Sequence, residues 1–104
     1  MGSGINIQQM VWATWERVLA IVEELRGAPS AKFRDRHGDW GRDFALFLGR
    51  SACGLPLRTL GRAVGELSEA AVCVAVQRFA GRLAKEKPLR QMVESARNLL
   101  NVNA

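Results

Sequence analysis

The side chains of this sequence that could do chemistry are mostly cationic. The chain has 15 Lys and Arg residues against 10 Asp and Glu residues, a formal net charge of +5 at pH 7. The cations gather in residues 26–62 (Arg26, Lys32, Arg34, Arg36, Arg42, Arg50, Arg58, Arg62) and in residues 78–97 (Arg78, Arg82, Lys85, Lys87, Arg90, Arg97). Patches of cations predict a polyanionic partner such as nucleic acid, and a solvated surface is the simpler alternative.

Few other residue types could support catalysis or bind a metal. The chain has no tyrosine and one histidine, His37, which has no Cys or second His nearby in the sequence. We interpret Asp35, Asp39 and Asp43 as surface charges, because nothing suggests a pair of carboxylates for acid and base catalysis. We therefore expect a protein that is not an enzyme and that uses neither a metal nor a cofactor.

The cysteines and the hydropathy pattern indicate a cytoplasmic protein. Cys53 and Cys73 are too few and too isolated for a zinc site, so we interpret them as reduced thiols in or near the core. No apolar run approaches the ~20 residues that cross a bilayer, and no secretory leader pattern is present, so we expect no membrane partner. Because Met1-Gly2-Ser3-Gly4 is typical of an expression tag, we interpret residues 1–5 as a tag remnant.

The elements that must position the cations are helices. Apolar residues recur at helical spacing near residues 7–26, 40–53, 57–64, 69–83 and 88–100. Residues 30–39 lack this spacing and are interpreted as a basic loop. At 104 residues the chain fits one domain, so we expect an all-α, five-helix bundle. Trp12 and Trp15 belong to the first apolar stripe and are expected in the core.

Residues 57–79 have the layout of a helix-turn-helix, in which a short helix, a tight turn with glycine and a longer helix follow one another. Gly65 lies where the chain leaves the short helix, and Gly61 lies where a second helix could cross closely. Ser68 is a candidate N-cap, because its hydroxyl can accept an orphan backbone N–H. We place the whole unit at about residues 57–87. A plain pair of helices in a bundle is the alternative.

The longer helix of this unit has two faces. Val72, Val76 and Phe79 form an apolar stripe that is expected to pack on the core. The side chains expected at the major groove of DNA are Ser68, Glu69, Ala70, Cys73, Val74, Gln77 and Arg78. The candidate phosphate contacts around them are Arg34, Arg36, Arg50, Arg58 and Arg62.

Two segments carry a family resemblance. Residues 54–65 read Gly-Leu-Pro-Leu-Arg-Thr-Leu-Gly-Arg-Ala-Val-Gly, and Val72 and Ala75 follow without a gap. This pattern resembles the DNA-binding C-terminal domain (domain IV) of the bacterial replication initiator DnaA. The patterns of residues 71–79 and 82–90 are more closely similar to the DnaA-like tail of REP-associated tyrosine transposases. The resemblance extends over about residues 12–100 and implies an all-α DNA-binding fold of the DnaA domain IV and Trp repressor type.

The resemblance also implies roles for single residues. It puts Arg34 where the initiator inserts an arginine into the minor groove, and Arg50 where the initiator holds a phosphate. Leu57 and Arg58 fall where the initiator offers backbone N–H groups to phosphate. The base-reading run Arg-Asp-His-Thr-Thr of the initiator is absent, since residues 67–71 read Leu-Ser-Glu-Ala-Ala. The resemblance therefore does not extend to the initiator's own target sequence.

Two hypotheses of different classes follow. A tyrosine transposase needs a tyrosine nucleophile and a metal-binding pair of histidines, and this chain has neither, so strand cleavage by it is excluded. The leading hypothesis is a recognition module for double-stranded or hairpin DNA. The rival is a helical interaction or oligomerisation domain, in which the apolar faces of the first and last helices meet a partner chain. A homodimer is compatible with both.

Overall fold

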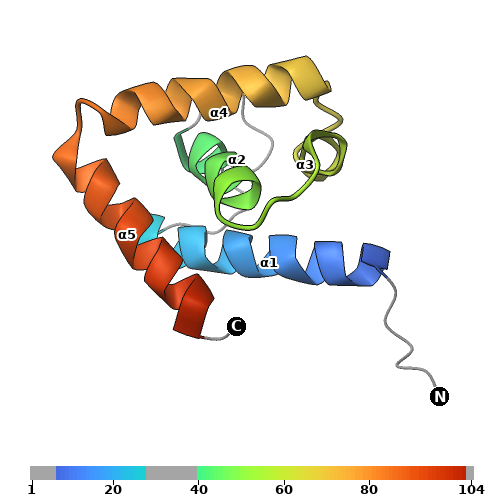
Figure 1. The fold of residues 1–104 in the computed structure, drawn as a ribbon, viewed down its shortest axis with the longest axis horizontal. Coiled ribbons are helices and arrows are strands. Elements are labelled where there is room, and N and C mark those ends of the chain that lie inside the picture. Colours follow the sequence, from blue (N-terminus) through green and yellow to red (C-terminus); the bar gives the residue numbers. More distant parts are fainter. Residues whose placement is uncertain (1–6, 28–39, 103–104) are drawn as a thin grey trace.

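The computed structural model describes residues 7–27 and 40–102, which form five helices and no strand (Figure 1). The helices are α1 (Ile7–Arg26), α2 (Trp40–Ser51), α3 (Leu57–Ala63), α4 (Glu69–Leu83) and α5 (Lys87–Val102). The predicted all-α class is confirmed. The second helix ends two residues before the predicted position, because the backbone N–H groups of Ala52 and Cys53 both donate to Leu48 O, at 3.0 and 3.2 Å, in a closing turn.

Local signals in the sequence end α1 and α2 and begin α5. Gly27 and Gly54 follow α1 and α2 with φ of 76° and 66°, a left-handed conformation that glycine adopts without a steric penalty. Pro88 lies in the first turn of α5, where the backbone N–H that proline lacks would have no partner in the helix. These three residues set the helix boundaries that the periodicity leaves undefined.

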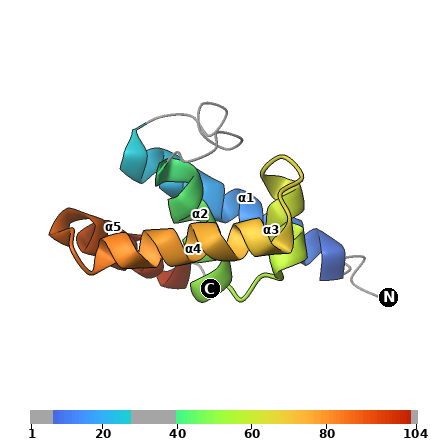
Figure 2. The ribbon, with the colours of Figure 1, turned by 90° about the horizontal axis from the view of Figure 1, so that it is seen from above.

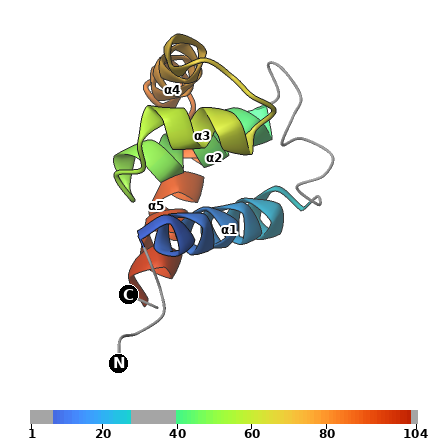
Figure 3. The same cartoon turned by 90° about the vertical axis from the view of Figure 1, so that its right-hand side faces the viewer.

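The helices pack in layers around α2. Figure 3 shows α4 on one side, α2 and α3 in the middle, and α1 on the other side. In Figure 1, α5 runs from the C-terminal end of α4 back to α1 and closes one end of the molecule. Figure 2 is viewed from the side of α4 and shows this helix lying across the outer surface, with its length uncovered by the other helices.

The central position of α2 explains its burial on every side. All residues from Gly41 to Gly49 are buried, including Arg42 and Asp43. Phe44 and Phe47 of α2 each place a ring 5.3 Å from the ring of Phe79 on α4, so aromatic contacts join these two helices. The helical spacing of apolar residues near 40–53 predicts one apolar stripe, formed by Phe44, Phe47, Leu48 and Ala52. That expectation is wrong at this end of the helix, since Ala52 lies in the turn after α2 and is exposed.

The first apolar stripe is confirmed except at Trp12. Trp15, Val18 and Val22 are buried, but the side chain of Trp12 is 37% exposed. Figures 1 and 2 show the N-terminal end of α1 extending past α3, beyond the layer that covers the rest of the helix. The sequence spacing therefore gives the correct face of α1, but it does not show where along the helix the core ends.

Candidate nucleic-acid interface

A tight connection joins α3 to α4. The backbone N–H groups of Val64 and Leu67 both donate to Gly61 O, at 3.3 and 2.8 Å. Gly65 and Glu66 both have positive φ, 89° and 62°. Glycine adopts this conformation readily, whereas Glu66 does so at a cost of about 1 to 2 kcal/mol. Two consecutive left-handed residues reverse the chain within this short segment, as the predicted exit at Gly65 requires.

Gly61 lies at the closest approach within this unit. A Cβ atom added at Gly61 would collide with the carbonyl oxygen of Leu67, and Val72 Cγ2 of α4 would lie 3.5 Å away. We expected a close approach here and assigned it to a crossing helix. The closest neighbour is instead the backbone of the connection itself. The angle between α3 and α4 thus depends on the absence of a side chain at residue 61.

Ser68 is the N-cap of α4, as predicted. Its Oγ accepts the backbone N–H of Ala71 at 3.1 Å. Glu69 follows in the first turn of α4, where a carboxylate interacts favourably with the positive end of the helix dipole. Both Ser68 and Glu69 are exposed. The hydroxyl of Ser68 therefore has a structural role in addition to any contact with a ligand.

The two faces of α4 agree with the sequence pattern. Val72, Ala75 and Phe79 are buried, and Val76 is half-buried. The outer face is built from mostly small side chains, namely Ala70, Cys73, Val74, Gln77, Ala80 and Gly81. Val74 is 56% exposed, and the amide of Gln77 makes only a long contact of 3.8 Å with Cys73 Sγ. This face offers little bulk and one exposed amide group.

Two arginines of α3 flank the start of α4. Arg58 and Arg62 are exposed and line a shallow hollow together with Glu66, Leu67, Ser68 and Glu69. Leu57 is half-buried, and Pro56 before it supplies no side chain to cap the first backbone N–H groups of α3. The hollow thus combines two cations with two carboxylates at the entrance of the longer helix.

Arg50 has an internal partner. Its Nη1 donates to the carbonyl oxygen of Leu55 at 3.0 Å, which holds the connection between α2 and α3. The residue itself is exposed at the end of α2. Of the remaining predicted contacts, Arg34 and Arg36 lie outside the described residues, as does His37. The described interface therefore comprises α3, the connection and α4.

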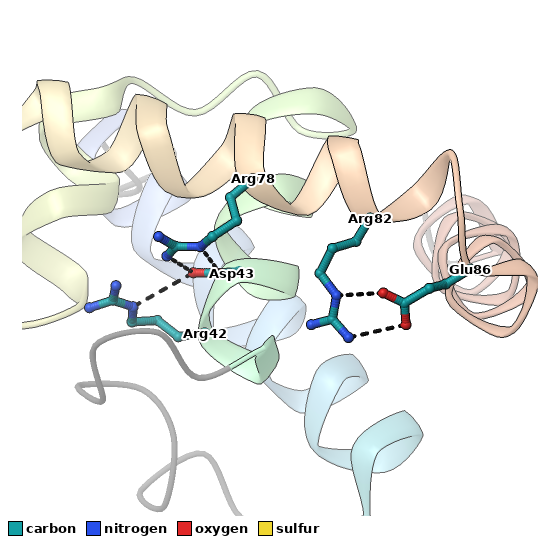
Figure 4. Close-up of polar contacts among 5 residues, drawn as sticks. All are labelled: Arg42, Asp43, Arg78, Arg82 and Glu86. Atoms are coloured by element: carbon teal, nitrogen blue, oxygen red, sulfur yellow. Dashed lines mark hydrogen bonds and ion pairs between the residues drawn. The ribbon is translucent and has the colours of Figure 1, made fainter.

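Arg78 is paired with a buried aspartate, which the sequence analysis missed. Its Nε and Nη2 donate to Asp43 Oδ2 and Oδ1 at 2.9 and 3.1 Å (Figure 4). These hydrogen bonds raise the pKa of the Arg78 guanidinium, and partial burial opposes the shift. The interpretation of Asp43 as a surface charge is wrong, because α2 is covered on all sides and the Asp43 side chain is 4% exposed. The two residues are 35 positions apart, so local spacing could not reveal the pair.

The cations between the last turn of α4 and the first turn of α5 (Arg82, Lys85, Lys87 and Arg90) are partly engaged in local contacts. Arg82 donates from Nε and Nη2 to the two carboxylate oxygens of Glu86 at 2.7 and 3.1 Å (Figure 4). The bond from Arg82 lowers the pKa of the Glu86 carboxyl. Arg90 Nη1 donates to Leu83 O at 2.7 Å and so satisfies a carbonyl at the end of α4. Lys85 and Lys87 are exposed at this corner.

The cysteines lie on different sides of α2. Cys73 belongs to the outer face of α4, whereas Cys53 lines a hollow with Arg17 and Leu100 between α1 and the ends of α2 and α5. Both are free and half-buried. Burial raises the pKa of the Cys53 thiol, and the charge of Arg17 acts in the opposite direction.

No helix in residues 7–27 and 40–102 is both long enough and apolar enough to cross a membrane. Comparison of the chain with protein-family models, curated proteins and solved structures gave no match.

Proposed function

We propose that the chain is a DNA-binding domain in which α3 and α4 act as a helix-turn-helix and α4 enters the major groove. The connection at Gly61 and Gly65 fixes the angle between the two helices, and Ser68 caps the start of α4. The inner face of α4 is anchored to α2 through Phe79, while its outer face stays uncovered. A recognition helix requires this combination of a fixed position and a free face.

The observation that carries the proposal is the position of Arg58 and Arg62. They line one hollow together with Ser68, the N-cap of α4, and Glu69, its first residue. The N-terminal end of a recognition helix makes the base contacts, and the preceding helix crosses the phosphate backbone. Exposed guanidinium groups on α3 are therefore suited to bind phosphates beside the groove that α4 occupies.

The composition of the outer face of α4 fits a major groove. Ala70 and Cys73 permit close approach of the helix to the base edges. The exposed Val74 can contact the methyl group of thymine, and the amide of Gln77 can donate to and accept from adenine. Because of the resemblance to the initiator domain and the transposase tail, we propose two ligands for testing, plain duplex DNA and hairpin DNA.

The rival function has less surface available. The apolar side chains of α1 and α5 pack inside this chain, where Trp15, Val22, Leu89 and Val93 are buried. Trp12 and Val74 are the large apolar side chains that remain exposed among the described residues. Among the side chains that the structure describes, these two are scattered, which is ordinary for a protein surface, and they form no contiguous patch of the kind that a partner helix buries.

Titration of fluorescent duplex DNA with single arginine variants tests the proposal. Arg58→Gln and Arg62→Gln should each weaken binding several-fold, uniformly across sequences, because each removes one phosphate contact. Arg97→Gln is the matched control. It removes the same charge from α5, where Arg97 lines a different hollow with Ser51 and Asn101, and it should bind like the wild type.

Two results would contradict the proposal. Equal weakening by Arg97→Gln would mean that net charge, and not this face, controls binding. A wild-type protein that binds neither duplex nor hairpin DNA but forms a stable oligomer in light scattering would support the rival function.

A further inference from the structure

Asp43 and Arg78 form an ion pair in which one side chain is buried and the other is partly exposed. Both nitrogens that face the carboxylate are bonded to it, at 2.9 and 3.1 Å. The Asp43 side chain is 4% exposed, whereas the Arg78 side chain is 39% exposed. A buried carboxylate on α2 thus holds one edge of a guanidinium on α4, and the side chain that carries this guanidinium is partly exposed.

The remaining nitrogen of Arg78, Nη1, makes no hydrogen bond within the part of the chain that the structure describes. Guanidinium groups bind phosphate through a planar set of N–H donors, and the orientation of that plane decides which donors reach the oxygen atoms. An arginine that is free in solution loses side-chain entropy when it binds. Arg78 is already held in one orientation, so much of this loss precedes DNA binding.

A second guanidinium, that of Arg42, lies close to Asp43. Arg42 Nε lies 4.0 Å from Asp43 Oδ1 and has no hydrogen-bond partner, and its side chain is 3% exposed. One carboxylate therefore faces two guanidinium groups, as Figure 4 shows, and the three groups together carry a formal charge of +1. Among the described residues this cluster carries an excess of positive charge, which favours the approach of a further anion.

Arg78 also stands beside the face that is proposed to read DNA. It follows Gln77 and lies one helical turn after Val74, both of which are exposed. Residues at the border of a helix that lies in a groove meet the phosphates at the groove edge. The position of Arg78 on α4 therefore matches a phosphate and not a base.

We propose that Asp43 is a positioning residue that presents Arg78 to a phosphate of the DNA backbone at the edge of the major groove. This inference rests on the proposed DNA-binding function. If the pair were only a structural lock between α2 and α4, its loss would change stability but would not change DNA affinity.

Asp43→Asn separates positioning from simple electrostatics, because the two effects have opposite signs. The substitution removes a negative charge close to the DNA, so charge alone predicts tighter binding. Loss of the two hydrogen bonds that orient the Arg78 guanidinium predicts weaker binding, by about tenfold. This is the amount expected for one oriented charge-assisted hydrogen bond. Arg78→Lys keeps the positive charge but lacks the planar set of N–H donors, so it should show a similar loss of DNA affinity. The double variant should bind no more weakly than either single variant.

The experiment is a fluorescence anisotropy titration at one salt concentration, with a duplex selected by the wild-type protein from a random library. Circular dichroism at the same temperature shows which variants are folded. Leu89→Ala, a buried substitution on α5, is the control for lost stability and should bind normally while folded. If Asp43→Asn does not fold, Arg78→Lys still tests the proposal. Arg78 is partly exposed, so its substitution is expected to disturb the fold less than a substitution of the buried Asp43.

The outcomes distinguish the two proposals. Wild-type binding with a tenfold loss in Asp43→Asn and Arg78→Lys supports the positioning role. Wild-type binding with unchanged or tighter binding by both variants overturns the positioning role and leaves the DNA-binding function standing. Failure of the wild-type protein to select or bind any duplex overturns both.

Discussion

Phe79 of α4 stacks on Phe44 of α2, with ring centroids 5.3 Å apart and ring planes inclined by 11°. Both rings are fully buried, and Phe79 also contacts Phe47. The residues just before Phe79, Gln77 and Arg78, are exposed. The stack therefore anchors α4 along the side opposite to its proposed DNA-binding face.

Phe79→Ala should lower the free energy of unfolding by about 3 to 5 kcal/mol, because it removes the stacked ring and leaves a cavity between α2 and α4. Urea denaturation followed by circular dichroism measures this change. Val74→Ala on the exposed face is the control, and it should change stability by less than about 0.5 kcal/mol. Equal effects of the two substitutions would mean that the faces of α4 are assigned wrongly.

Gly61→Ala should destabilise the protein by about 1 to 3 kcal/mol, because the added methyl group overlaps the carbonyl oxygen of Leu67. Gly81→Ala is the matched substitution in α4. Apart from the adjoining backbone of α4 itself, nothing described lies within 4 Å of the methyl group that it adds, so it should stabilise the helix by about 0.5 to 1 kcal/mol. Thermal or urea unfolding of the two variants checks that their changes in stability have opposite signs. A Gly61→Ala variant as stable as the wild type would contradict the close approach of residue 61 to Leu67.

Cys53 should react slowly with alkylating reagents in the folded protein, since burial raises the pKa of its thiol and the thiolate is the reactive form. Below the ordinary thiol pKa both states stay protonated. As the pH rises through that value, the unfolded chain loses the proton first, so stability falls with rising pH. The slow reaction of Cys53 is tested by iodoacetamide labelling of a Cys73→Ser variant between pH 7 and 9, in buffer and in urea. Equal rates in both solvents would disprove it.

Glu69 should affect base preference and not general affinity. It is exposed in the first turn of α4, where a carboxylate can accept a hydrogen bond from cytosine N4 and repels nearby phosphate. Glu69→Ala should leave non-specific binding unchanged or slightly tighter and relax the preference at one base pair by about 1 to 3 kcal/mol. Titrations against a selected and a scrambled duplex at equal salt measure both quantities. An equal loss on both duplexes would place Glu69 away from the bases.

The sequence is sufficient to predict the five helices because their signals are local. Apolar spacing identifies the segments, and Gly27, Gly54, Ser68 and Pro88 mark their ends. The same spacing predicts the inner and outer faces of α4, since an amphipathic helix has only one face that can be buried.

The errors concern residues whose surroundings come from distant parts of the chain. Asp43 has the spacing of a surface charge, and its burial follows only from the arrangement of α1 and α4 on either side of α2. Trp12 has the spacing of a core residue, but its side chain is 37% exposed. No local pattern encodes how far a neighbouring helix extends, so these features require the three-dimensional structure.

The salt dependence of duplex affinity tests the DNA-binding proposal most directly. Each phosphate contact should lower log affinity by about 0.9 for every tenfold increase in salt, because binding releases condensed counterions. With Arg58, Arg62 and Arg78 in contact, the wild-type slope should be about −2.7 or steeper. A slope near zero, or no duplex binding at low salt, would contradict the account.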